Sequence, residues 1–288
     1  MSEPTSTPSP AALPPIVSPE WVLAHRNDVV VADVRWYLDG RSSAVAYETG
    51  HIEGAVYVDM DTDLSDHSLP ASLGRHPLPS PEHFAAAMSR LGIADDTPVV
   101  AYDDTGGATA GRLVVMLRST GHPAALLDGG LRAWTGPTAT GAPTPRAAAS
   151  FTARAWPADR FASADEVAHT ASGNGVVLDA RSADRFRGES EPIDPRPGHV
   201  PGARNAPWLA NVDRETGRYR SPEELRAHYA ALGISAGSDV ICYCGSGVSA
   251  CADVLGIEHA GFAPPRLYVA SWSGWSSETH RPAATGDA

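Results

Sequence analysis

The sequence predicts an α/β protein built from two copies of one domain, each with a mostly parallel sheet flanked by helices. Three observations support this fold class. The chain has 288 residues, which is long for one hydrophobic core and suits two domains of about 100–150 residues. Its second half repeats its first. Within each copy, short β-branched runs alternate with helical stretches, as they do in βα units.

The repeat preserves both the order and the spacing of its parts. A segment that begins Ser80-Pro-Glu and ends Leu91-Gly-Ile returns 141 residues later as Ser221-Pro-Glu and Leu232-Gly-Ile. Chance similarity would not preserve such an order. Three further pairs match in sequence, namely residues 50–55 with 198–203, 99–102 with 240–243, and 126–134 with 267–275.

The elements of the first copy follow in order along the chain. Residues 1–16 are rich in Pro, Ser, Thr and Ala and lack the features of a signal peptide, so we expect a disordered tail. The helix that starts after Ser80 has the clearest signals, because Ser suits the N-cap and Pro the first turn, and a glycine follows its end. The pattern predicts strands at 29–33 and 99–102, and helices at 80–91 and 110–120.

The boundary between the copies lies in a stretch without hydrophobic periodicity. Residues 136–145 are dominated by Thr, Ala, Gly and Pro, a composition typical of a linker. We therefore predict a first domain over residues 17–135, a linker over 136–157 and a second domain over 158–288.

Composition excludes several classes of function. The 22 basic and 34 acidic residues give a net charge of −12, which repels nucleic acid and anionic lipid, so we expect neither as a partner. A small anionic substrate stays compatible, because net charge is screened beyond about 8 Å. The three cysteines lie within ten positions, which is not a disulfide framework. No apolar run is long enough to cross a membrane, and we expect a monomeric, cytoplasmic protein.

The chemistry is expected where the two copies differ. Ligands bind at the carboxyl ends of parallel strands, and there the first copy reads Asp103-Asp-Thr-Gly-Gly-Ala whereas the second reads Cys244-Gly-Ser-Gly-Val-Ser. A strand, a Gly-rich loop and a helix start together direct backbone N–H groups and the positive end of the helix dipole at one point. A thiolate or persulfide anion on Cys244 is favoured there, and the thiolate is the nucleophile.

The other two cysteines have simpler interpretations. Cys242 lies two positions before Cys244, and such a pair could indicate metal or disulfide chemistry, but a buried strand residue is the favoured interpretation. Cys251 is expected to pack in the following helix, with the alternative that it resolves an oxidised Cys244.

The segment Cys244-Gly-Ser-Gly-Val-Ser-Ala250 resembles the active-site loop of rhodanese-type sulfurtransferases, and in particular the 3-mercaptopyruvate form, Cys-Gly-Ser-Gly-Val-Thr-Ala. Only the serine at 249 differs. The similarity runs from about residue 18 to 284 and includes Leu127-Asp-Gly-Gly and Ser271-Trp-Ser-Gly-Trp. It implies two rhodanese domains, in which an inactive first copy closes over an active second copy.

The resemblance also implies a mechanism. Cys244 takes sulfur from a small anionic donor, holds it as a persulfide and passes it to cyanide or to a thiol such as thioredoxin, with no metal or organic cofactor. Ser246 would form a triad with His76 and Asp61 of the first domain. The donor would contact the loop residues Gly245, Gly247, Val248 and Ser249.

Recognition of a carboxylate favours arginine over lysine, because the guanidinium group donates two parallel hydrogen bonds. Arg185 matches the first substrate-binding arginine of the family. The family's second substrate-binding arginine is expected in the segment Glu191-Pro-Ile-Asp-Pro-Arg196, which is rearranged here. Ile193 then occupies the position of that arginine. Whether Arg196 substitutes for it is left open by the sequence. The loop after Cys244 lacks the basic residues of thiosulfate enzymes, which favours 3-mercaptopyruvate over thiosulfate as the donor.

Two other functions fit this sequence less well. A cysteine-based phosphatase needs an arginine six positions after its cysteine to hold phosphate, and position 250 is alanine. A non-catalytic binding or regulatory module suits the first copy, whose loop begins with Asp103. The presence of Cys244 argues against that role for the whole chain.

Overall fold

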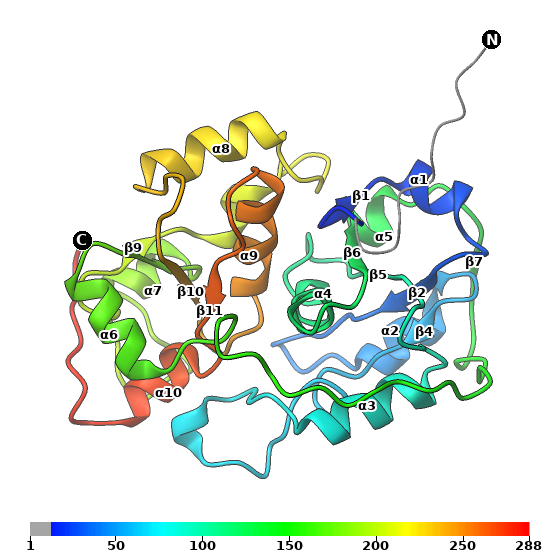
Figure 1. Ribbon diagram of the computed structural model, residues 1–288, viewed down its shortest axis with the longest axis horizontal. Coiled ribbons are helices and arrows are strands. Elements are labelled where there is room, and N and C mark those ends of the chain that lie inside the picture. The colour runs from blue at the N-terminus through cyan, green and yellow to red at the C-terminus, as the bar shows by residue number, and fades with distance from the viewer. Residues whose placement is uncertain (1–12, 288) are drawn as a thin grey trace.

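The computed structural model describes residues 13–287, which form two α/β domains side by side (Figure 1). The first contains a five-stranded sheet in the order β1-β6-β5-β2-β4, and the second a four-stranded sheet in the order β11-β10-β8-β9. Every strand pair in these two sheets is parallel. The predicted fold class is therefore confirmed.

In the first domain, helices cover a sheet whose central strands are buried along their whole length. The sheet strands are β1 (Ile16–Val17), β2 (Val30–Asp33), β4 (Val56–Tyr57), β5 (Val99–Tyr102) and β6 (Ala124–Leu127). The helices are α1 (Pro19–Ala24), α2 (Ser43–Thr49), α3 (Pro81–Arg90), α4 (Ala110–Ser119) and α5 (Gly130–Ala133), with the 3-10 helix η2 (Ala71–Leu73). A small antiparallel pair joins β3 (His51–Ile52) to β7 (Thr138–Ala139).

The second domain repeats this plan with fewer strands. Its strands are β8 (Val176–Asp179), β9 (Arg204–Asn205), β10 (Val240–Tyr243) and β11 (Arg266–Leu267). Its helices are α6 (Ala164–Ser172), α7 (Ala183–Arg187), α8 (Pro222–Ala231), α9 (Ala250–His259) and α10 (Ser271–Ser277), with the 3-10 helix η3 (Trp208–Asn211).

The helix starts predicted from Ser80 and Ser221 are confirmed. The Ser80 side chain accepts the N–H of His83 at 3.1 Å, and Pro81 opens α3. In α8 the signals form a full capping box, in which Ser221 accepts the N–H of Glu224 and the Glu224 carboxylate accepts the N–H of Ser221. Each helix start is thus fixed by local hydrogen bonds.

The ends of the first domain differ from the predicted boundaries. Of the predicted tail, residues 1–12 lie outside the described residues. Its last part is corrected, because Leu13 is buried and Ile16 begins β1, which pairs with β6. The polar composition of the tail hid these few apolar residues, which the sheet and its surroundings can bury. The predicted linker also starts too early, since β7 at Thr138–Ala139 still pairs with β3.

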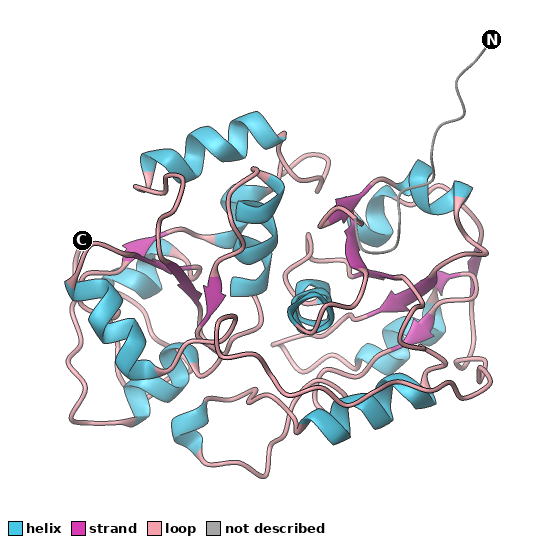
Figure 2. Ribbon diagram, viewed as in Figure 1, coloured by secondary structure: helices cyan, strands magenta, loops and turns pink. Residues whose placement is uncertain are grey.

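The two domains meet through equivalent helices, α4 and α9, which lie side by side between the two sheets (Figure 2). Gly111 of α4 packs against Cys251 of α9, where a Cβ at position 111 would lie 3.3 Å from the Cys251 Cβ. One cluster of buried apolar side chains includes residues of both helices and both sheets. The domains therefore share a core, and their relative placement is fixed by apolar packing.

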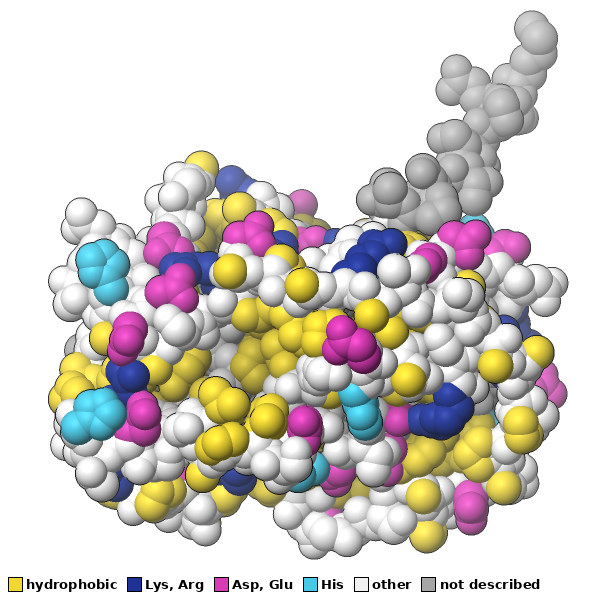
Figure 3. Space-filling view, turned by 60° about the horizontal axis from the view of Figure 1, so that its bottom comes forward, with side chains coloured by type: hydrophobic (Ala, Val, Ile, Leu, Met, Phe, Trp, Pro, Cys, Tyr) yellow, Lys and Arg dark blue, Asp and Glu magenta, His cyan; other side chains and the backbone are white. Residues whose placement is uncertain are grey.

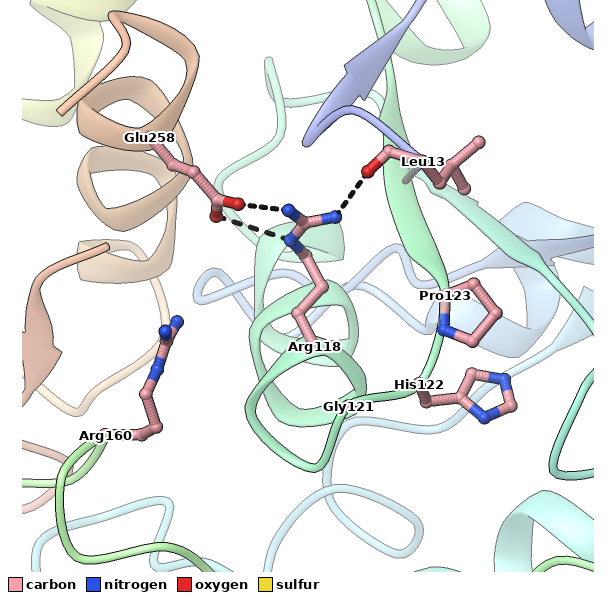
Figure 4. A pocket seen from close by; sticks show the side chains of 7 residues that line it. All are labelled: Leu13, Arg118, Gly121, His122, Pro123, Arg160 and Glu258. Atoms are coloured by element: carbon pink, nitrogen blue, oxygen red, sulfur yellow. Dashed lines mark hydrogen bonds and ion pairs between the residues drawn. The ribbon is translucent and has the colours of Figure 1, made fainter. Parts of the chain in front are cut away.

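A polar contact closes the far end of this interface. Arg118 of α4 pairs with Glu258 of α9 and also donates to the backbone oxygen of Leu13 at 2.9 Å (Figure 4). A cavity of about 140 Å³ lies here, also lined by Arg160 and His122.

The distribution of surface charge and the length of the helices bear on possible partners. On the face drawn in Figure 3, basic side chains are scattered among acidic ones and form no broad basic surface. Within residues 13–287, no helix has both the length and the apolar character needed to span a bilayer.

Asp253 is a buried carboxyl group of the second domain without a basic partner among the described residues. Oδ1 of Asp253 in α9 accepts a hydrogen bond from Asn211 at 2.6 Å, whereas Oδ2 is buried with no partner among the described residues. Burial raises the pKa of Asp253 to about 8. The folded protein therefore holds a proton at neutral pH that the unfolded chain releases.

Replacement Asp253→Asn should stabilise the protein more at pH 8 than at about pH 5. The unfolded carboxyl ionises above its ordinary pKa of 3.8 while the folded one stays protonated, so the native free energy of unfolding falls with rising pH, by up to about 1.4 kcal/mol per pH unit. The amide has no such proton and still accepts from Asn211. Thermal unfolding at both pH values measures the difference, with the exposed Glu223→Gln as control. Parallel pH dependence of the native protein and Asp253→Asn would contradict the assignment.

Candidate active site

Cys244 directly follows β10 and lines a cavity of about 470 Å³ between the two domains. Its side chain is only 1% exposed, so a reactant reaches the sulfur through this cavity. The sulfur accepts the N–H of Gly247 at 3.2 Å, and the Ser271 hydroxyl lies 3.9 Å away. The nucleophile predicted from the sequence therefore sits at a cavity with hydrogen-bond donors around it.

The backbone of Cys244 is held by the start of α10. Its N–H donates to the Ser271 hydroxyl at 3.0 Å, and its carbonyl accepts the N–H of Trp272 at 2.9 Å. Ser271 adopts a φ of +53°, the one non-glycine residue with positive φ among the described residues. Such a conformation costs about 1–3 kcal/mol and persists where surrounding contacts fix it. Here those contacts orient the cysteine.

The loop of the first copy shows what this backbone arrangement binds. The Asp103 carboxylate accepts five hydrogen bonds at 2.8–3.0 Å, four from backbone N–H groups and one from the Thr109 hydroxyl. The backbone donors are Thr105, Gly107, Thr109 and Ala110. A loop of this type therefore encloses a negative group.

The loop of the second copy is one residue shorter between strand and helix, and its cysteine reaches fewer donors. The N–H of Gly247 meets the sulfur, whereas the N–H groups of Ser246, Val248, Ser249 and Ala250 have no acceptor within residues 13–287. These groups are thus available to an anion that extends beyond the Cys244 sulfur. The outer sulfur of a persulfide is such an anion.

His76 and Asp61 of the first domain lie together near this loop. His76 Nε2 is 3.6 Å from Asp61 Oδ1, and the Trp36 indole donates to Asp61 Oδ2 at 3.2 Å. Burial lowers the pKa of His76, and the nearby His76 ring lowers the pKa of Asp61 to about 2. His76 Nδ1 is buried without a partner in the described part of the chain. No hydrogen bond there joins His76 to Ser246, which lines the cavity, so the triad stays a prediction.

These residues also include the one group within residues 13–287 whose composition suits a metal ion. Asp61, His67 and His76 offer ligand atoms within 4.8 Å of one another, and nitrogen and oxygen ligands of this kind bind transition metals. A metal bound there would compete with the proposed triad for His76.

Arg112 of α4 is a residue that the sequence analysis missed. Its side chain is fully buried and donates to the carbonyl oxygens of Gly247 and His76 at 3.0 Å, and of Leu64 at 3.3 Å. It therefore joins the Cys244 loop to the segment that carries His76. Burial lowers the pKa of Arg112. The sequence does contain a sign of its role, because this arginine interrupts an otherwise apolar stretch of the helix, Ala-Gly-Arg-Leu-Val-Val-Met.

Acidic side chains surround Arg185. It donates to Glu191 at 2.7 Å and to Asp194 at 3.0 Å, and it lines the cavity as predicted for a substrate-binding residue. Burial raises the pKa of Asp194, which also pairs with Arg75. Ile193 lines the same cavity with its side chain partly exposed.

The predicted substrate role of Arg196 is corrected. Its guanidinium group donates to the backbone oxygens of Ser276, Arg281, Trp275 and Glu278 at 2.9–3.1 Å. These carbonyls lie at the end of α10 and just beyond it, where helix carbonyls lack partners. Arg196 is therefore used as a helix cap and does not line the cavity.

Cys242 and Cys251 are both fully buried free thiols. Burial raises the pKa of Cys242 well above its ordinary value and that of Cys251 to about 12. Cys251 donates to the Gly247 carbonyl at 3.5 Å and packs at the domain interface. Both geometries agree with packing roles.

Comparison with known proteins adds to this geometry. A family model described as a rhodanese-like domain matches residues 18–137 and 163–278, one match for each copy. The chain belongs to the rhodanese family. Its two matched domains place it among the tandem rhodanese-domain sulfurtransferases.

Relatives of similar length support this placement. A protein of Pseudomonas aeruginosa, named as a probable 3-mercaptopyruvate sulfurtransferase, is 39% identical over 266 residues, which cover 90% of this chain and 93% of the relative. A Mycobacterium tuberculosis relative, 40% identical over 270 residues (91% and 93% covered), bears a thiosulfate sulfurtransferase name. The structure of 3-mercaptopyruvate sulfurtransferase from Leishmania major aligns with a TM-score of 0.83 at 32% identity, covering 96% of this chain and 78% of that one.

For this rhodanese, Arg112→Lys should reduce both stability and the rate at which Cys244 acquires sulfur. Lysine offers one ammonium group and cannot reach carbonyls on two sides, and each buried acceptor left unpaired costs about 1–3 kcal/mol. Thermal unfolding and mass spectrometry of persulfide formation over time measure the two effects. Arg118→Lys is the matched control on the same helix, since it weakens the interface at the opposite end of α9 from Cys244. A native rate of persulfide formation in Arg112→Lys would refute the role.

Proposed function

We propose that this rhodanese transfers sulfur from a small anionic donor, with 3-mercaptopyruvate preferred to thiosulfate, through a persulfide on Cys244. The acceptor is a thiol, such as that of thioredoxin, or cyanide. One observation carries the proposal: the Cys244 sulfur faces a cavity whose loop N–H groups at 246 and 248–250 have no acceptor among the described residues. The filled loop around Asp103 supports it, because it shows that such groups hold a negative charge.

In the first step, the Cys244 thiolate attacks the sulfur of 3-mercaptopyruvate. A sulfur–sulfur bond forms as the carbon–sulfur bond breaks, and the electron pair of the broken bond leaves as the enolate of pyruvate, which takes up a proton. The terminal sulfur of the persulfide then lies among the loop N–H groups. These preorganised donors stabilise its negative charge without reorganisation.

In the second step, an acceptor nucleophile attacks the terminal sulfur. The sulfur–sulfur bond of the persulfide breaks, its electron pair returns to the Cys244 sulfur, and the loop again holds a thiolate. A thiol acceptor leaves as a new persulfide and cyanide leaves as thiocyanate. Both partners would reach the sulfur through the cavity that Cys244 lines.

Ser246, His76 and Asp61 would pass the thiol proton of 3-mercaptopyruvate to the enolate. Burial lowers the pKa of His76, so its uncharged ring can take up that proton and return it through the Ser246 hydroxyl while Asp61 orients the ring. Thiosulfate needs no such proton, since its leaving group, sulfite, departs as a stable anion. Turnover of 3-mercaptopyruvate should therefore depend on the triad more than turnover of thiosulfate does.

The first copy has a structural role in this proposal. Its loop holds Asp103 where the second copy has the nucleophile, and the carboxylate uses the N–H groups that would otherwise bind a substrate anion. It contributes His76, Asp61 and Arg112 to the site of the other copy.

Replacement Cys244→Ser should abolish turnover of both donors, because an alkoxide is not available at neutral pH and no persulfide can form. Mass spectrometry of native protein treated with donor should show the mass of one added sulfur atom on Cys244. Formation of thiocyanate by Cys244→Ser at the native rate would overturn the proposal.

Replacement Ser246→Ala should lower kcat/KM for 3-mercaptopyruvate by about 100-fold, the usual range for loss of proton transfer, and affect thiosulfate much less. Steady-state rates with both donors test this, and Ser119→Ala at the remote end of α4 serves as control. An equal loss with both donors would rule out the triad.

A further inference from the structure

The donor site described so far has one assigned cation for a carboxylate. Arg185 lines the cavity, but Arg196 is occupied at the end of α10 and Ile193 presents an apolar side chain. A carboxylate has two oxygens and is best held by two guanidinium groups or by one in a bidentate geometry. Of the three further arginines that line the cavity, Arg41 is largely exposed and Arg181 is paired with Asp179 and Glu191, which leaves one.

Arg75 of the first domain is that arginine. Its N–H donates to the Ser273 hydroxyl of α10 at 3.1 Å. The preceding Gly74 has a φ of +87°, and a Cβ there would lie 2.5 Å from the Ala270 carbonyl oxygen. The backbone at Gly74 and Arg75 is thus in direct contact with the second domain. This contact fixes the position from which the Arg75 side chain extends beside the active loop.

The side chains of Arg75 and Arg185 converge next to Cys244. A Cβ built at Gly245 would lie 3.0 Å from Arg75 Nη2 and 3.4 Å from Arg185 Nη1. Neither of these two nitrogens has an acceptor among residues 13–287, whereas other nitrogens of the same groups pair with Asp194 and Glu191. The unpaired donors are therefore the ones that face the residue after the nucleophile.

We propose that Arg75 is the second carboxylate-binding residue of this enzyme, and that Arg75 Nη2 and Arg185 Nη1 together hold the carboxylate of the sulfur donor. This inference rests on the proposed function and adds that the first domain supplies part of the donor site. Donor binding then spans the domain interface.

The acidic neighbours fit this role. The Asp194 carboxylate bridges Arg75 and Arg185, with its side chain 2% exposed, and so fixes both guanidinium groups while leaving one nitrogen of each for substrate. Glu191 holds Arg185 from another side. Gly245 fits as well, because a side chain there would occupy the space between the two nitrogens and the cavity. In the rearranged segment, Ile193 stands where a second substrate arginine was expected, and Asp194 lies where it can orient Arg75.

Replacement Arg75→Met should raise KM for 3-mercaptopyruvate by about 10- to 100-fold, the effect of losing one charge-assisted hydrogen bond, with kcat changed much less. Arg75→Lys should show a smaller rise. Mercaptoacetone, which has the same thiol and ketone but no carboxylate, should be turned over equally well by native and variant protein. An equal loss with mercaptoacetone would show a merely structural role and overturn the inference.

A rescue experiment distinguishes loss of the Arg75 charge from misfolding of the variant. The double variant Arg75→Met/Ile193→Arg returns a cation to the cavity from the second domain and should recover a low KM for 3-mercaptopyruvate. Arg90→Met, which removes another first-domain arginine paired with a buried aspartate, should leave KM unchanged. Unchanged KM in Arg75→Met would overturn the inference and leave the proposed function intact.

If no turnover is seen, the affinity for pyruvate, measured by calorimetry, tests the carboxylate site independently of the proposed sulfur donor. Native protein that binds pyruvate more tightly than Arg75→Met, yet forms no persulfide from 3-mercaptopyruvate, would sink the proposed donor and support the carboxylate site. Equal pyruvate affinity in native protein and Arg75→Met would sink the site.

Discussion

Backbone N–H groups at the turn between a parallel strand and the next helix all point to one place, and buried donors need an acceptor. The two copies in this chain meet that requirement differently. Asp103 places its own carboxylate among the donors, so the first loop is complete. Cys244 reaches one of them, through Gly247. In the proposed reaction the remaining donors bind the second sulfur that Cys244 acquires.

The rest of the molecule keeps that loop in place. Ser271 and Trp272 fix the backbone of Cys244 from one side, and Arg112 fixes Gly247 from the other. Arg112 comes from the copy that lacks a nucleophile, and it is buried in a core that both domains share. Duplication thus produced one reactive copy and one copy whose helix α4 and its neighbours complete the site. If the two domains were separate, the faces of α4 and α9 that contact each other would be exposed.

Local charge and net charge have different consequences here. The chain carries a net charge of −12, yet Arg75 and Arg185 stand within hydrogen-bonding range of the same point in the cavity. Asp194 and Glu191 hold them without using all their donors. At such short range the guanidinium groups outweigh distant acidic residues, because ionic screening removes charge effects beyond about 8 Å.

The sequence alone determined the features that depend on neighbouring residues or on repetition. The two copies, the caps of α3 and α8, the buried strands and the position of Cys244 after β10 all follow from local patterns, because capping and periodicity involve residues a few positions apart. Family resemblance added His76 and Asp61, which the fold does bring together.

Which long side chains reach the cavity depends on how the two domains pack together. Arg196 carries the same charge as Arg75, but packing turns the first toward the carbonyls at the end of α10 and the second toward Gly245. Arg112 and Gly247 are 135 positions apart and touch because α4 packs on α9. An arginine has many rotamers and a long reach, so its partner is chosen by the surrounding fold and not by its place in the chain.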